Sequence, residues 1–348
     1  FLSSFLCSFI IIKILIKYSA KLRLVDHPNY RKIHSVATPT VGGLGIILTF
    51  IILFLFSWYN KWDLFPFSTE EAIVLLIASI IVILTGLVDD LKGLRAREKF
   101  LFQIIASIIV VIGIPNLQQI DWPLSDLFDS KMYNSILCIF YIISILNAIN
   151  LIDGLDGLAG GVSIIITSTF IGLFILSEGN LTNLFPMYIL LGSLGGFMIY
   201  NKPPAKTFLG DTGSLFIGWF FALSSLLYAQ KTNLSLSILL PIMVLGLPAF
   251  DVIFVMFKRF SSRHNYKIKE RLKFTFQADN SHLHHILLSS GFSKNKALFL
   301  LYLITVFTSC MALIAFLKRD TINFMYSVIF ILFVIFIIRF LVSWRKKQ

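Results

Sequence analysis

The chain has 348 residues, of which 57% are hydrophobic and only 14% are charged, and its formal net charge is +12. Because a soluble domain carries about 25% charged residues, this composition excludes an ordinary soluble protein and predicts that residues 1–348 form a single polytopic membrane domain. In a soluble protein the net charge would suggest a nucleic-acid partner. Here the basic residues follow the loops between apolar runs, so we predict the lipid bilayer as a partner and no nucleic acid.

The apolar residues gather in runs that are long enough, or nearly so, to cross a membrane. A helix needs about 20 residues to span the roughly 30 Å hydrocarbon core. The first run is interpreted as a span and not as a signal peptide, because no small-residue cleavage site follows it. Pro241 and Pro248 lie inside the ninth run and predict a kink there. We predict an all-α membrane protein with eleven transmembrane helices, at residues 1–20, 41–58, 72–88, 100–114, 133–151, 158–177, 186–200, 213–229, 235–257, 297–317 and 322–342.

Lysine and arginine are distributed unequally between the loops that join these runs. If the N-terminus lies outside the cell, the cytoplasmic loops hold 22 of the 30 basic residues and the outer loops hold 5. Cytoplasmic loops of membrane proteins carry such an excess. The sequence therefore predicts an outside N-terminus and a cytoplasmic C-terminus. The longest cytoplasmic segment is the basic loop 258–296.

Short clusters of aspartate and glycine lie at the cytoplasmic ends of the predicted helices. Asp89 and Asp90 end the third run, and Asp211 precedes the eighth in the sequence Gly-Asp-Thr-Gly-Ser. Aspartates at a membrane boundary are costly to desolvate, and neighbouring ones repel each other. Such clusters therefore indicate a bound cation or a catalytic role more than a solvated loop face. Oxygen ligands beside hydroxyl groups and a helix start suit Mg²⁺, which commonly bridges phosphates.

A third cluster surrounds the end of the fifth run and contains Asn147, Asn150, Asp153 and Asp156. Residues three apart drift by about 60° around a helix, so Asn147, Asn150 and Asp153 are expected to face a common cavity. The glycines that follow allow a tight turn and a close approach of the backbone to a phosphate.

Three histidines, His282, His284 and His285, lie near the end of the long basic loop. Zinc binding, recognition of a phosphate or sugar, and plain surface histidines are the alternatives. Recognition of an anionic substrate fits better than zinc, because no thiolate or HExxH motif is near.

Two further features lie near the same predicted membrane face. The segment 26–43 adds Arg31, Lys32 and His34, for which anchoring to lipid headgroups is the alternative to substrate binding. Asp251 is an acid inside the ninth run, and an intramembrane acid predicts a function, with a nearby Lys or Arg as its partner.

The motifs occur in a distinctive order. They are DHPNYRKIH followed by TPTVGG (26–43), GLVDD (86–90), NAINLIDGLDGLAGG (147–161), FLGDTGS (208–214) and HLHH (282–285). With this combination the chain resembles the polyprenyl-phosphate N-acetylhexosamine-1-phosphate transferases (glycosyltransferase family 4) from about residue 24 to 290. The eleven predicted spans and the DNSHLHH form are similar to the WecA/TagO-like branch.

The resemblance implies an Mg²⁺-dependent enzyme in which Mn²⁺ can substitute. It would transfer N-acetylhexosamine-1-phosphate, and GlcNAc-1-phosphate in this branch, from the UDP-sugar to undecaprenyl phosphate and release UMP. The product, undecaprenyl-diphospho-sugar, would begin a cell-envelope polysaccharide such as lipopolysaccharide or teichoic acid. The implied location is a bacterial cytoplasmic membrane, and a homodimer is left open.

The same resemblance assigns expected roles to the site residues. Asp211 is the expected direct Mg²⁺ ligand, with Asp90 and Asp153 as further metal ligands. Asp89 or Asp90 is expected to position the lipid phosphate, because a phosphate monoester with a second pKa of about 6 needs little base catalysis. The implied catalytic residues are Asp89, Asp90, Asp153, Asp156 and Asp211. The implied substrate-binding residues are Asn147, Asn150, Arg31, Lys32, His34, Lys99, His282, His284, His285 and Arg263.

Three alternative functions are weighed against this one. A phospho-MurNAc-pentapeptide transferase of peptidoglycan synthesis belongs to the same family but typically has ten spans and a differently spaced histidine run. An ion-coupled transporter would place acids near the bilayer midplane and show repeat symmetry, whereas these acids lie at one rim. A membrane phosphatase would release free phosphate from the lipid and no UMP.

Overall fold

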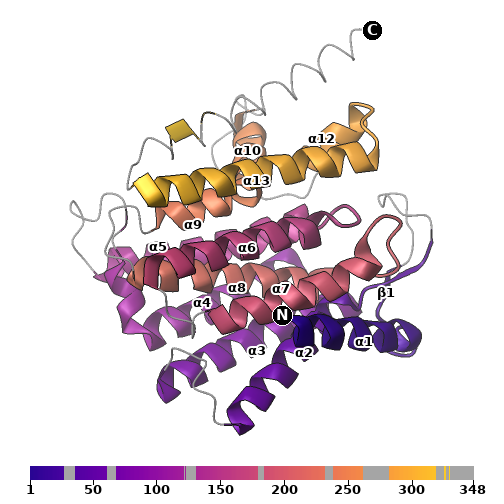
Figure 1. Cartoon of the computed structure of the whole chain (residues 1–348), viewed down its shortest axis with the longest axis horizontal. Coiled ribbons are helices and arrows are strands. Elements are labelled where there is room, and N and C mark those ends of the chain that lie inside the picture. The colour runs from indigo at the N-terminus through magenta and orange to yellow at the C-terminus, as the bar shows by residue number, and fades with distance from the viewer. Residues whose placement is uncertain are drawn as a thin grey trace.

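The computed structural model of the protein is a bundle of helices with one short β ladder (Figure 1). The structure describes residues 1–26, 36–60, 68–120, 122, 131–178, 184–231, 238–261, 282–318, 325, 326 and 329. The described elements are α1 (Leu2–Tyr18), β1 (Val25–Asp26), β2 (Thr38–Pro39), α2 (Gly42–Tyr59), α3 (Thr69–Lys92), α4 (Ala96–Gly113), the 3₁₀ helix η1 (Pro115–Gln119), α5 (Lys131–Ile152), α6 (Leu158–Glu178), α7 (Leu184–Asn201), α8 (Gly210–Lys231), α9 (Leu239–Val244), α10 (Gly246–Ser261), α12 (Leu283–Ser289) and α13 (Lys294–Lys318).

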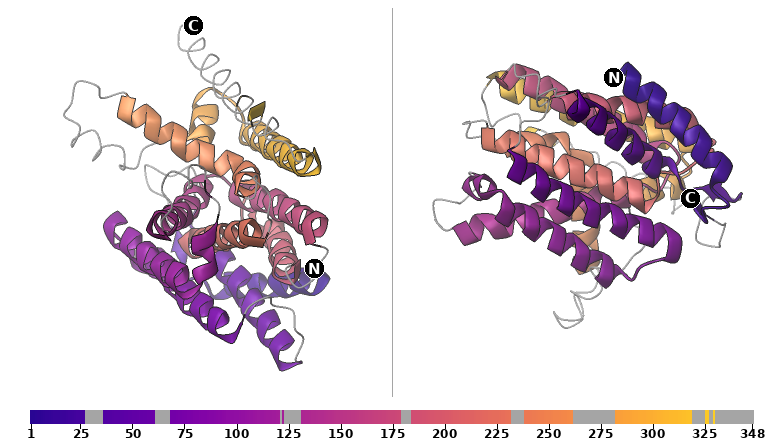
Figure 2. Two further views of the ribbon diagram at one scale, coloured as in Figure 1. Left: turned by 90° about the vertical axis from the view of Figure 1, so that its left-hand side faces the viewer. Right: turned by 90° about the horizontal axis from the view of Figure 1, so that it is seen from below.

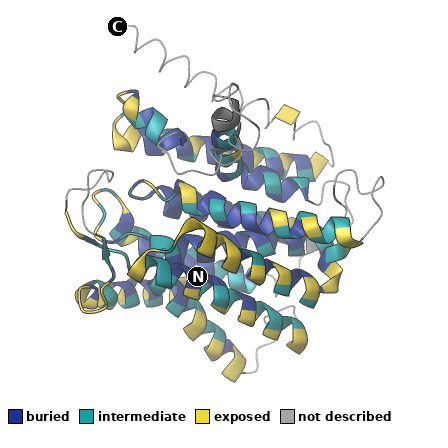
Figure 3. Cartoon of the chain, turned by 180° about the vertical axis from the view of Figure 1, so that it is seen from behind, coloured by how far each residue is buried: buried dark blue, intermediate teal, exposed yellow. Residues whose placement is uncertain are grey.

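Helix α8 occupies the centre of the bundle. It packs against α2, α3 and α5, whereas α13 packs against α6 and α9 on one side of the bundle and α1 lies against α7 at its edge (Figures 1 and 2). In the most apolar stretch of α8, 83% of the residues are buried inside the protein, whereas in that of α3 only 22% are buried. Figure 3 shows the same contrast between buried inner helices and exposed outer ones. The first turn of α8 is therefore surrounded by other elements, which makes it a suitable place for a site.

Helix α3 is apolar on its outer face as well. Its exposed large hydrophobic residues recur at helical spacing, which places them on one face, as expected for contact with lipid; they are Ile73, Leu76, Ile77, Ile80 and Leu84. Seven of the described helices, namely α2, α3, α5, α6, α7, α8 and α13, are long and apolar enough to cross a membrane. The composition of the chain and these helices agree on a multi-pass membrane protein.

The first eight predicted spans and the tenth each coincide with one described helix. The ninth is divided, because α9 ends at Val244 and α10 begins at Gly246. Pro248 lies in the first turn of α10, where a helix does not need the missing N–H group. The eleventh span, 322–342, lies outside the described residues except at 325, 326 and 329. The number of spans and their orientation stay predictions.

The predicted loop 258–296 is shorter than expected within the described residues. Helix α10 continues to Ser261, α12 forms a short helix in the segment, and α13 begins at Lys294. The neighbouring helices therefore extend a few residues into the predicted loop at each end, and the loop itself stays a prediction. The prediction of an all-α fold holds apart from the β ladder, in which Val25 pairs with Pro39 and Asp26 with Thr38.

Strand β2 connects this ladder to the start of α8. The amide of Phe208 donates to the carbonyl of Pro39 at 2.8 Å, and the amide of Gly43 donates to the carbonyl of Leu209 at 2.8 Å. These bonds bring Asp26 and Thr40 beside the first turn of α8, although they lie far from it in the sequence.

Candidate active site

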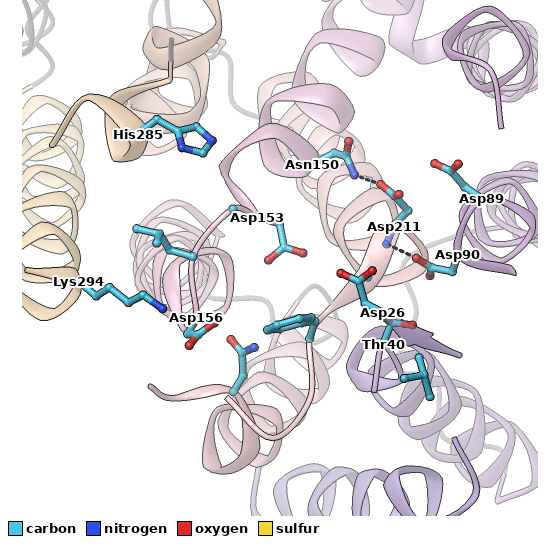
Figure 4. A pocket seen from close by; sticks show the side chains of 16 residues that line it. Asp26, Thr40, Asp89, Asp90, Asn150, Asp153, Asp156, Asp211, His285 and Lys294 are labelled. Carbon is cyan, nitrogen blue, oxygen red and sulfur yellow. Dashed lines mark hydrogen bonds between the residues drawn. The ribbon is translucent and has the colours of Figure 1, made fainter. Parts of the chain in front are cut away.

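A cavity of about 510 Å³ opens beside the first turn of α8 (Figure 4). Its lining comes from β1, the start of α2, the ends of α3, α5 and α7, the turn before α6, the start of α8, and helices α12 and α13. Six aspartates contribute to it, namely Asp26, Asp89, Asp90, Asp153, Asp156 and Asp211. The other lining residues are Val25, Thr40, Asn150, Gly154, Leu155, Asn201, Phe208, Gly210, His285 and Lys294.

Asp90 holds the first turn of α8 in place. Its Oδ1 accepts a hydrogen bond from the amide of Asp211 at 2.8 Å, and its Oδ2 accepts from the amide of Thr212 at 2.9 Å and from the hydroxyl of Thr212 at 2.5 Å. The first amides of a helix have no partner within the helix and carry partial positive charge, so a carboxylate is favourable there. The end of α3 therefore caps α8 from a distance in sequence of more than one hundred residues.

Two glycines allow this cap. A methyl group on Gly86 would lie 2.5 Å from the Cα atom of Thr212, so only glycine lets α3 approach the start of α8 so closely. Gly210 has a φ of 75°, in the left-handed region that favours glycine, and a methyl group there would lie 2.8 Å from Oδ2 of Asp90. Steric crowding between α3 and the start of α8 thus explains why Gly86 of GLVDD and Gly210 of GDTGS are glycines.

Lys99, in the first turn of α4, joins two aspartates. Its ammonium lies 2.7 Å from Oδ2 of Asp89 and 2.7 Å from Oδ1 of Asp211. The other oxygen of Asp89 accepts a hydrogen bond from the amide of Leu94 at 2.7 Å. The Lys99 side chain is 15% exposed, so these ion pairs are shielded from water and hold the ends of α3 and α8 in register.

Asn150 reaches Asp211 from the end of α5. Its side-chain amide donates to Oδ1 of Asp211 and, at 2.8 Å, to the hydroxyl of Ser214. Asn147 behaves differently, because its amide donates to Oε1 of the buried Gln103 at 2.7 Å and it does not line the cavity. The prediction that Asn147 faces the common cavity was therefore wrong: the pair with Gln103 joins α5 to α4.

The turn 153–157 forms the opposite wall of the cavity. Helix α5 ends at Ile152, so Asp153 lies in a turn and not on the helical arc that the spacing predicted. Asn201 Oδ1 accepts from the amide of Gly157 at 2.9 Å, and the hydroxyl of Tyr302 donates to the carbonyl of Gly157 at 2.6 Å. Helices α7 and α13 thereby fix the turn that carries Asp153 and Asp156.

Asp153 is a carboxyl group whose surroundings suit a cation. Burial raises the pKa of Asp153 to about 8, and the neighbouring Asp211, Asp90 and Asp156 add to the rise. No described residue donates a hydrogen bond to its side chain. Across the cavity, Oδ2 of Asp211 also has no described partner, whereas both oxygens of Asp90 are engaged by the cap on α8.

These carboxylates fit a magnesium ion as a donor set. Among the described residues there is no group of three or more His, Cys, Asp or Glu side chains that could hold a metal by themselves. Mg²⁺ typically binds through one or two carboxylates together with water and substrate phosphates, so a pair of hard oxygen donors is sufficient. Asp211 and Asp153 fit that role better than Asp90.

The histidines pack over the turn 153–157. Only 5% of His282 and 3% of His284 is exposed, which excludes a role as surface histidines for these two. Nδ1 of His282 lies 3.0 Å from Oδ2 of Asp251, and the amide of Leu283 donates to Oδ1 of Asp251 at 2.9 Å. Among the described residues, the partners of Asp251 are thus a histidine and a main-chain amide, and the predicted Lys or Arg partner is not found there.

His284 and His285 are neighbours in α12 that contact the turn 153–157 and the cavity, respectively. Their ring centroids lie 4.2 Å apart, and His285 lines the cavity. His284 contacts Gly154 directly, and its Nε2 is buried without a hydrogen-bond partner among the described residues. Burial, together with repulsion from His285 and His282, lowers the pKa of His284 to about 3.

The structure brings together most of the predicted site residues that it describes. The aspartates and Asn150 line the cavity, and Lys99 bonds to two of them. His285 lines it directly, and His284 supports its wall. Four predicted substrate-binding residues lie outside the described residues, namely Arg31, Lys32, His34 and Arg263.

Several residues around the cavity did not stand out in the sequence. Lys294 and Asn201 line it, and Tyr302 holds its turn. Lys294 and Asn201 are polar residues at the ends of apolar helices, which was the only available signal, and the same signal marks many ordinary helix ends. Tyr302 lies within an apolar run and carried no signal.

Comparison with known proteins places this geometry in a family. Over 335 residues the chain is 34% identical to a Bacillus subtilis (strain 168) protein named "Probable undecaprenyl-phosphate N-acetylglucosaminyl 1-phosphate transferase", covering 96% of this chain and 88% of that protein. A sequence profile of the family described as Glycosyl transferase family 4 matches residues 72–229. The chain belongs to glycosyl transferase family 4. The resemblance inferred from the motifs is thereby confirmed.

Other members of the family are more distant. The chain is 26% identical over 351 residues to the undecaprenyl-phosphate alpha-N-acetylglucosaminyl 1-phosphate transferase of Haemophilus influenzae, covering 98% of this chain and 93% of that protein. It is 29% identical over 321 residues to the phospho-N-acetylmuramoyl-pentapeptide-transferase of Carboxydothermus hydrogenoformans, covering 84% and 90%. Within glycosyl transferase family 4 the chain is a polyprenyl-phosphate sugar-1-phosphate transferase by relationship.

Proposed function

We propose that the protein transfers GlcNAc-1-phosphate from UDP-GlcNAc to undecaprenyl phosphate, which yields undecaprenyl-diphospho-GlcNAc and UMP. The observation that carries this proposal is the position of Asp211, which lies at the start of α8 in contact with Lys99 and Asn150 and is fixed by Asp90. A carboxylate held beside a cation and a helix start can handle both a metal ion and phosphates. The reaction would be the first membrane step of a cell-envelope polysaccharide.

The choice of GlcNAc as the sugar is supported by the names of the relatives. Relatives from Bacillus subtilis, Haemophilus influenzae and Thermotoga maritima are named as N-acetylglucosaminyl 1-phosphate transferases of undecaprenyl phosphate, at 34%, 26% and 27% identity. The pentapeptide transferase of Carboxydothermus hydrogenoformans is 29% identical. Because these identities are similar apart from the first, UDP-MurNAc-pentapeptide is the second candidate donor.

In the proposed reaction an oxygen of the lipid phosphate attacks the phosphorus atom that carries the sugar, and the bond from that phosphorus to the UMP oxygen breaks. Joining two anions makes charge neutralisation the main requirement of the site. Asp211 and Asp153 would hold Mg²⁺, which supplies positive charge for the phosphate oxygens when it is bound. Lys99, which is paired with Asp89 and Asp211, would hold these two carboxylates in position beside the reacting phosphates.

We further propose that the cavity faces the cytoplasm of a bacterial cell. The excess of basic residues in one set of loops supports this orientation. UDP-sugars are water-soluble donors, so a site at the water-exposed end of the bundle suits them, while the outer faces of α3 and its neighbours suit the lipid.

The direct test is UMP release by the purified protein in lipid bilayers with labelled UDP-GlcNAc and undecaprenyl phosphate. We expect Asp211→Asn and Asp89→Asn to lower turnover by at least about 100-fold, since each removes a charge in contact with Lys99. Glu70→Gln is the matched control, because Glu70 is an exposed acid in the first turn of α3, at the opposite end from Asp89. Near-native rates for both aspartate variants at normal expression would refute the assignment.

The donor is identified in the same assay with a panel of nucleotide sugars. UDP-GlcNAc, UDP-GalNAc and UDP-MurNAc-pentapeptide are compared at equal concentration, and UMP is measured. Preference for UDP-MurNAc-pentapeptide would show that the protein catalyses the peptidoglycan reaction instead. Release of inorganic phosphate from the lipid without UMP would indicate a phosphatase.

A further inference from the structure

Lys294 is the first residue of α13 and lines the cavity on the side opposite Asp89, the partner of Lys99 (Figure 4). Figure 4 shows its side chain extending toward Asp156, with His285 on the neighbouring helix. Its side chain is exposed to the cavity and the solvent. The position of this residue is fixed by Ser293, whose hydroxyl accepts from the amide of Lys296 at 3.4 Å and whose carbonyl accepts from the amide of Ala297 at 3.0 Å.

The two lysines at the cavity differ in their charge balance. Lys99 lies 2.7 Å from two carboxylates, so its charge is already compensated inside the protein. Within the part of the chain that the structure describes, Lys294 forms no ion pair. Of these two lysines, Lys294 is therefore the one whose charge can act on a ligand in the cavity.

The balance of charge in the cavity calls for such a cation. Six aspartates line it, and phosphates entering a cavity of this kind are repelled unless positive groups compensate them. A metal ion at Asp211 and Asp153 would act on one side only. The wall formed by Asp156, His285 and Lys294 lies on the other side (Figure 4).

The location of Lys294 is unfavourable for the helix that carries it. The first turn of α13 contains Lys294 and Lys296 and no acidic residue. Positive charge at a helix N-terminus is opposed by the partial positive charge of the free amides. The helix is thus not stabilised by either lysine, and of the two only Lys294 also lines the cavity.

We propose that Lys294 is a substrate-binding residue whose ammonium group contacts the diphosphate of the nucleotide-sugar donor. This inference rests on the proposed function and deepens it, because it assigns the donor to the α12–α13 side of the cavity. The lipid phosphate then belongs to the opposite side, near Asp89 at the end of α3 and the start of α4. The donor diphosphate would then lie between Lys294 and the carboxylates of Asp211 and Asp153, which would hold Mg²⁺ when it is bound.

Lys296 provides a matched control for this proposal. It lies in the same turn of α13, is also exposed, and does not line the cavity. Lys294→Ala and Lys296→Ala remove the same charge from the same helix end, so any effect on folding or on the general electrostatic field is shared. Only contact with the donor distinguishes them.

The experiment measures steady-state kinetics of UMP release by the full chain in bilayers. We expect Lys294→Ala to raise the KM for UDP-GlcNAc by about 10-fold or more, as for loss of a hydrogen bond to a charged group. Its kcat and its KM for undecaprenyl phosphate are expected to change by less than about 3-fold, and Lys294→Arg is expected to retain most of the affinity. Lys296→Ala is expected to match the unmodified protein in all three constants.

Two results would overturn the inference while the proposed function stands. One is a KM for UDP-GlcNAc in Lys294→Ala equal to that in Lys296→Ala. The other is an increase confined to the KM for undecaprenyl phosphate, which would assign Lys294 to the lipid phosphate. Loss of folding in the alanine variant is checked by thermal unfolding, and Lys294→Gln then replaces it. If the unmodified protein releases no UMP from any UDP-sugar, the proposed function fails and this inference fails with it.

Discussion

Asp90 accepts two hydrogen bonds from Thr212, one from its main-chain amide at 2.9 Å and one from its hydroxyl at 2.5 Å. A third bond, from the amide of Asp211, completes the cap on α8. Asp211 cannot change its direction without breaking this cap, since it is the residue between Gly210 and Thr212. The carboxylate of Asp90 therefore fixes the main chain that carries Asp211, while Lys99 and Asn150 hold the Asp211 carboxylate itself, and the first role of Asp90 in the structure is positioning.

Substitution of this pair should separate positioning from charge. Asp90→Asn turns one acceptor oxygen into a donor that faces the amides of α8, and we expect kcat to fall by about 100-fold. Thr212→Val removes only the hydroxyl bond to a charged acceptor, worth about 1.5–3 kcal/mol, and should lower kcat by about 10-fold. Both are measured as UMP release.

Thr49→Val is the control for the threonine variant. The hydroxyl of Thr49 bonds to the carbonyl of Gly45 within α2 and does not line the cavity. The substitution Thr49→Val should therefore leave kcat nearly unchanged. If Thr212→Val and Thr49→Val have equal activity, the cap on α8 does not determine the geometry of Asp211.

Lys99→Met tests the bridge between α3 and α8. The substitution keeps the length of the side chain but leaves Asp89 and Asp211 without their shared cation, so the two carboxylates repel each other. Because both carboxylates would then lose the cation that orients them, we expect kcat to fall by at least about 100-fold. Lys92→Met, at the exposed end of α3, is the control. Equal turnover in the two variants would show that Lys99 is not needed to orient either aspartate.

The sequence was sufficient to predict the clusters that form this site. Adjacent charged groups such as Asp89 and Asp90, and the glycines around Asp211, are local signals, because their desolvation and backbone requirements can be evaluated without the fold. The helices could also be predicted from the sequence, since an apolar run of sufficient length has few alternatives to a helix in a membrane. The motif order then identified the family.

The pairings between distant segments could not be predicted in the same way. Asn147 and Gln103 bond across two helices, and nothing in either segment indicates that the other lies opposite. Asp251 and His282 were each noted separately, but the expected partner of Asp251 was a basic residue. Such choices depend on how helices rotate and pack against one another, which hydropathy does not determine.

The pair Asp251 and His282 anchors α12 to α10, and its removal should loosen the wall that carries His284 and His285. We expect Asp251→Asn to lower the free energy of unfolding by about 1–3 kcal/mol, because a buried hydrogen-bond partner of His282 is lost. The effect on kcat should exceed that on the KM for undecaprenyl phosphate. Thermal unfolding and UMP release are measured together.

A double-mutant cycle of Asp251→Asn with His282→Asn provides the control for this pair. Residues in one hydrogen-bond network show interaction energies of about 0.5–3 kcal/mol. A coupling energy within error of zero would show that the two side chains contribute to stability independently. It would remove the argument that Asp251 acts through His282.

The acid stability of the protein should depend on His284. Its pKa is lowered to about 3 in the folded protein, chiefly because burial disfavours the charged ring, and its ordinary pKa is 6.5. Below pH 6.5 the unfolded chain binds a proton that the folded protein does not accept, so the contribution of His284 to stability is complete above pH 6.5 and is lost as the pH falls toward 3. The slope from one such group approaches about 1.4 kcal/mol per pH unit.

We expect the thermal midpoint of the protein in lipid nanodiscs to decrease from pH 6.5 to pH 5, and His284→Leu to decrease less over the same interval. The leucine variant removes the titrating group and keeps an apolar side chain against Gly154, so its lower overall stability does not alter the comparison of slopes. Measurements between pH 7 and 8 set the baseline, where His284 contributes no slope. Parallel curves for the two proteins below pH 6.5 would contradict a neutral, buried His284 and assign the acid sensitivity to other groups.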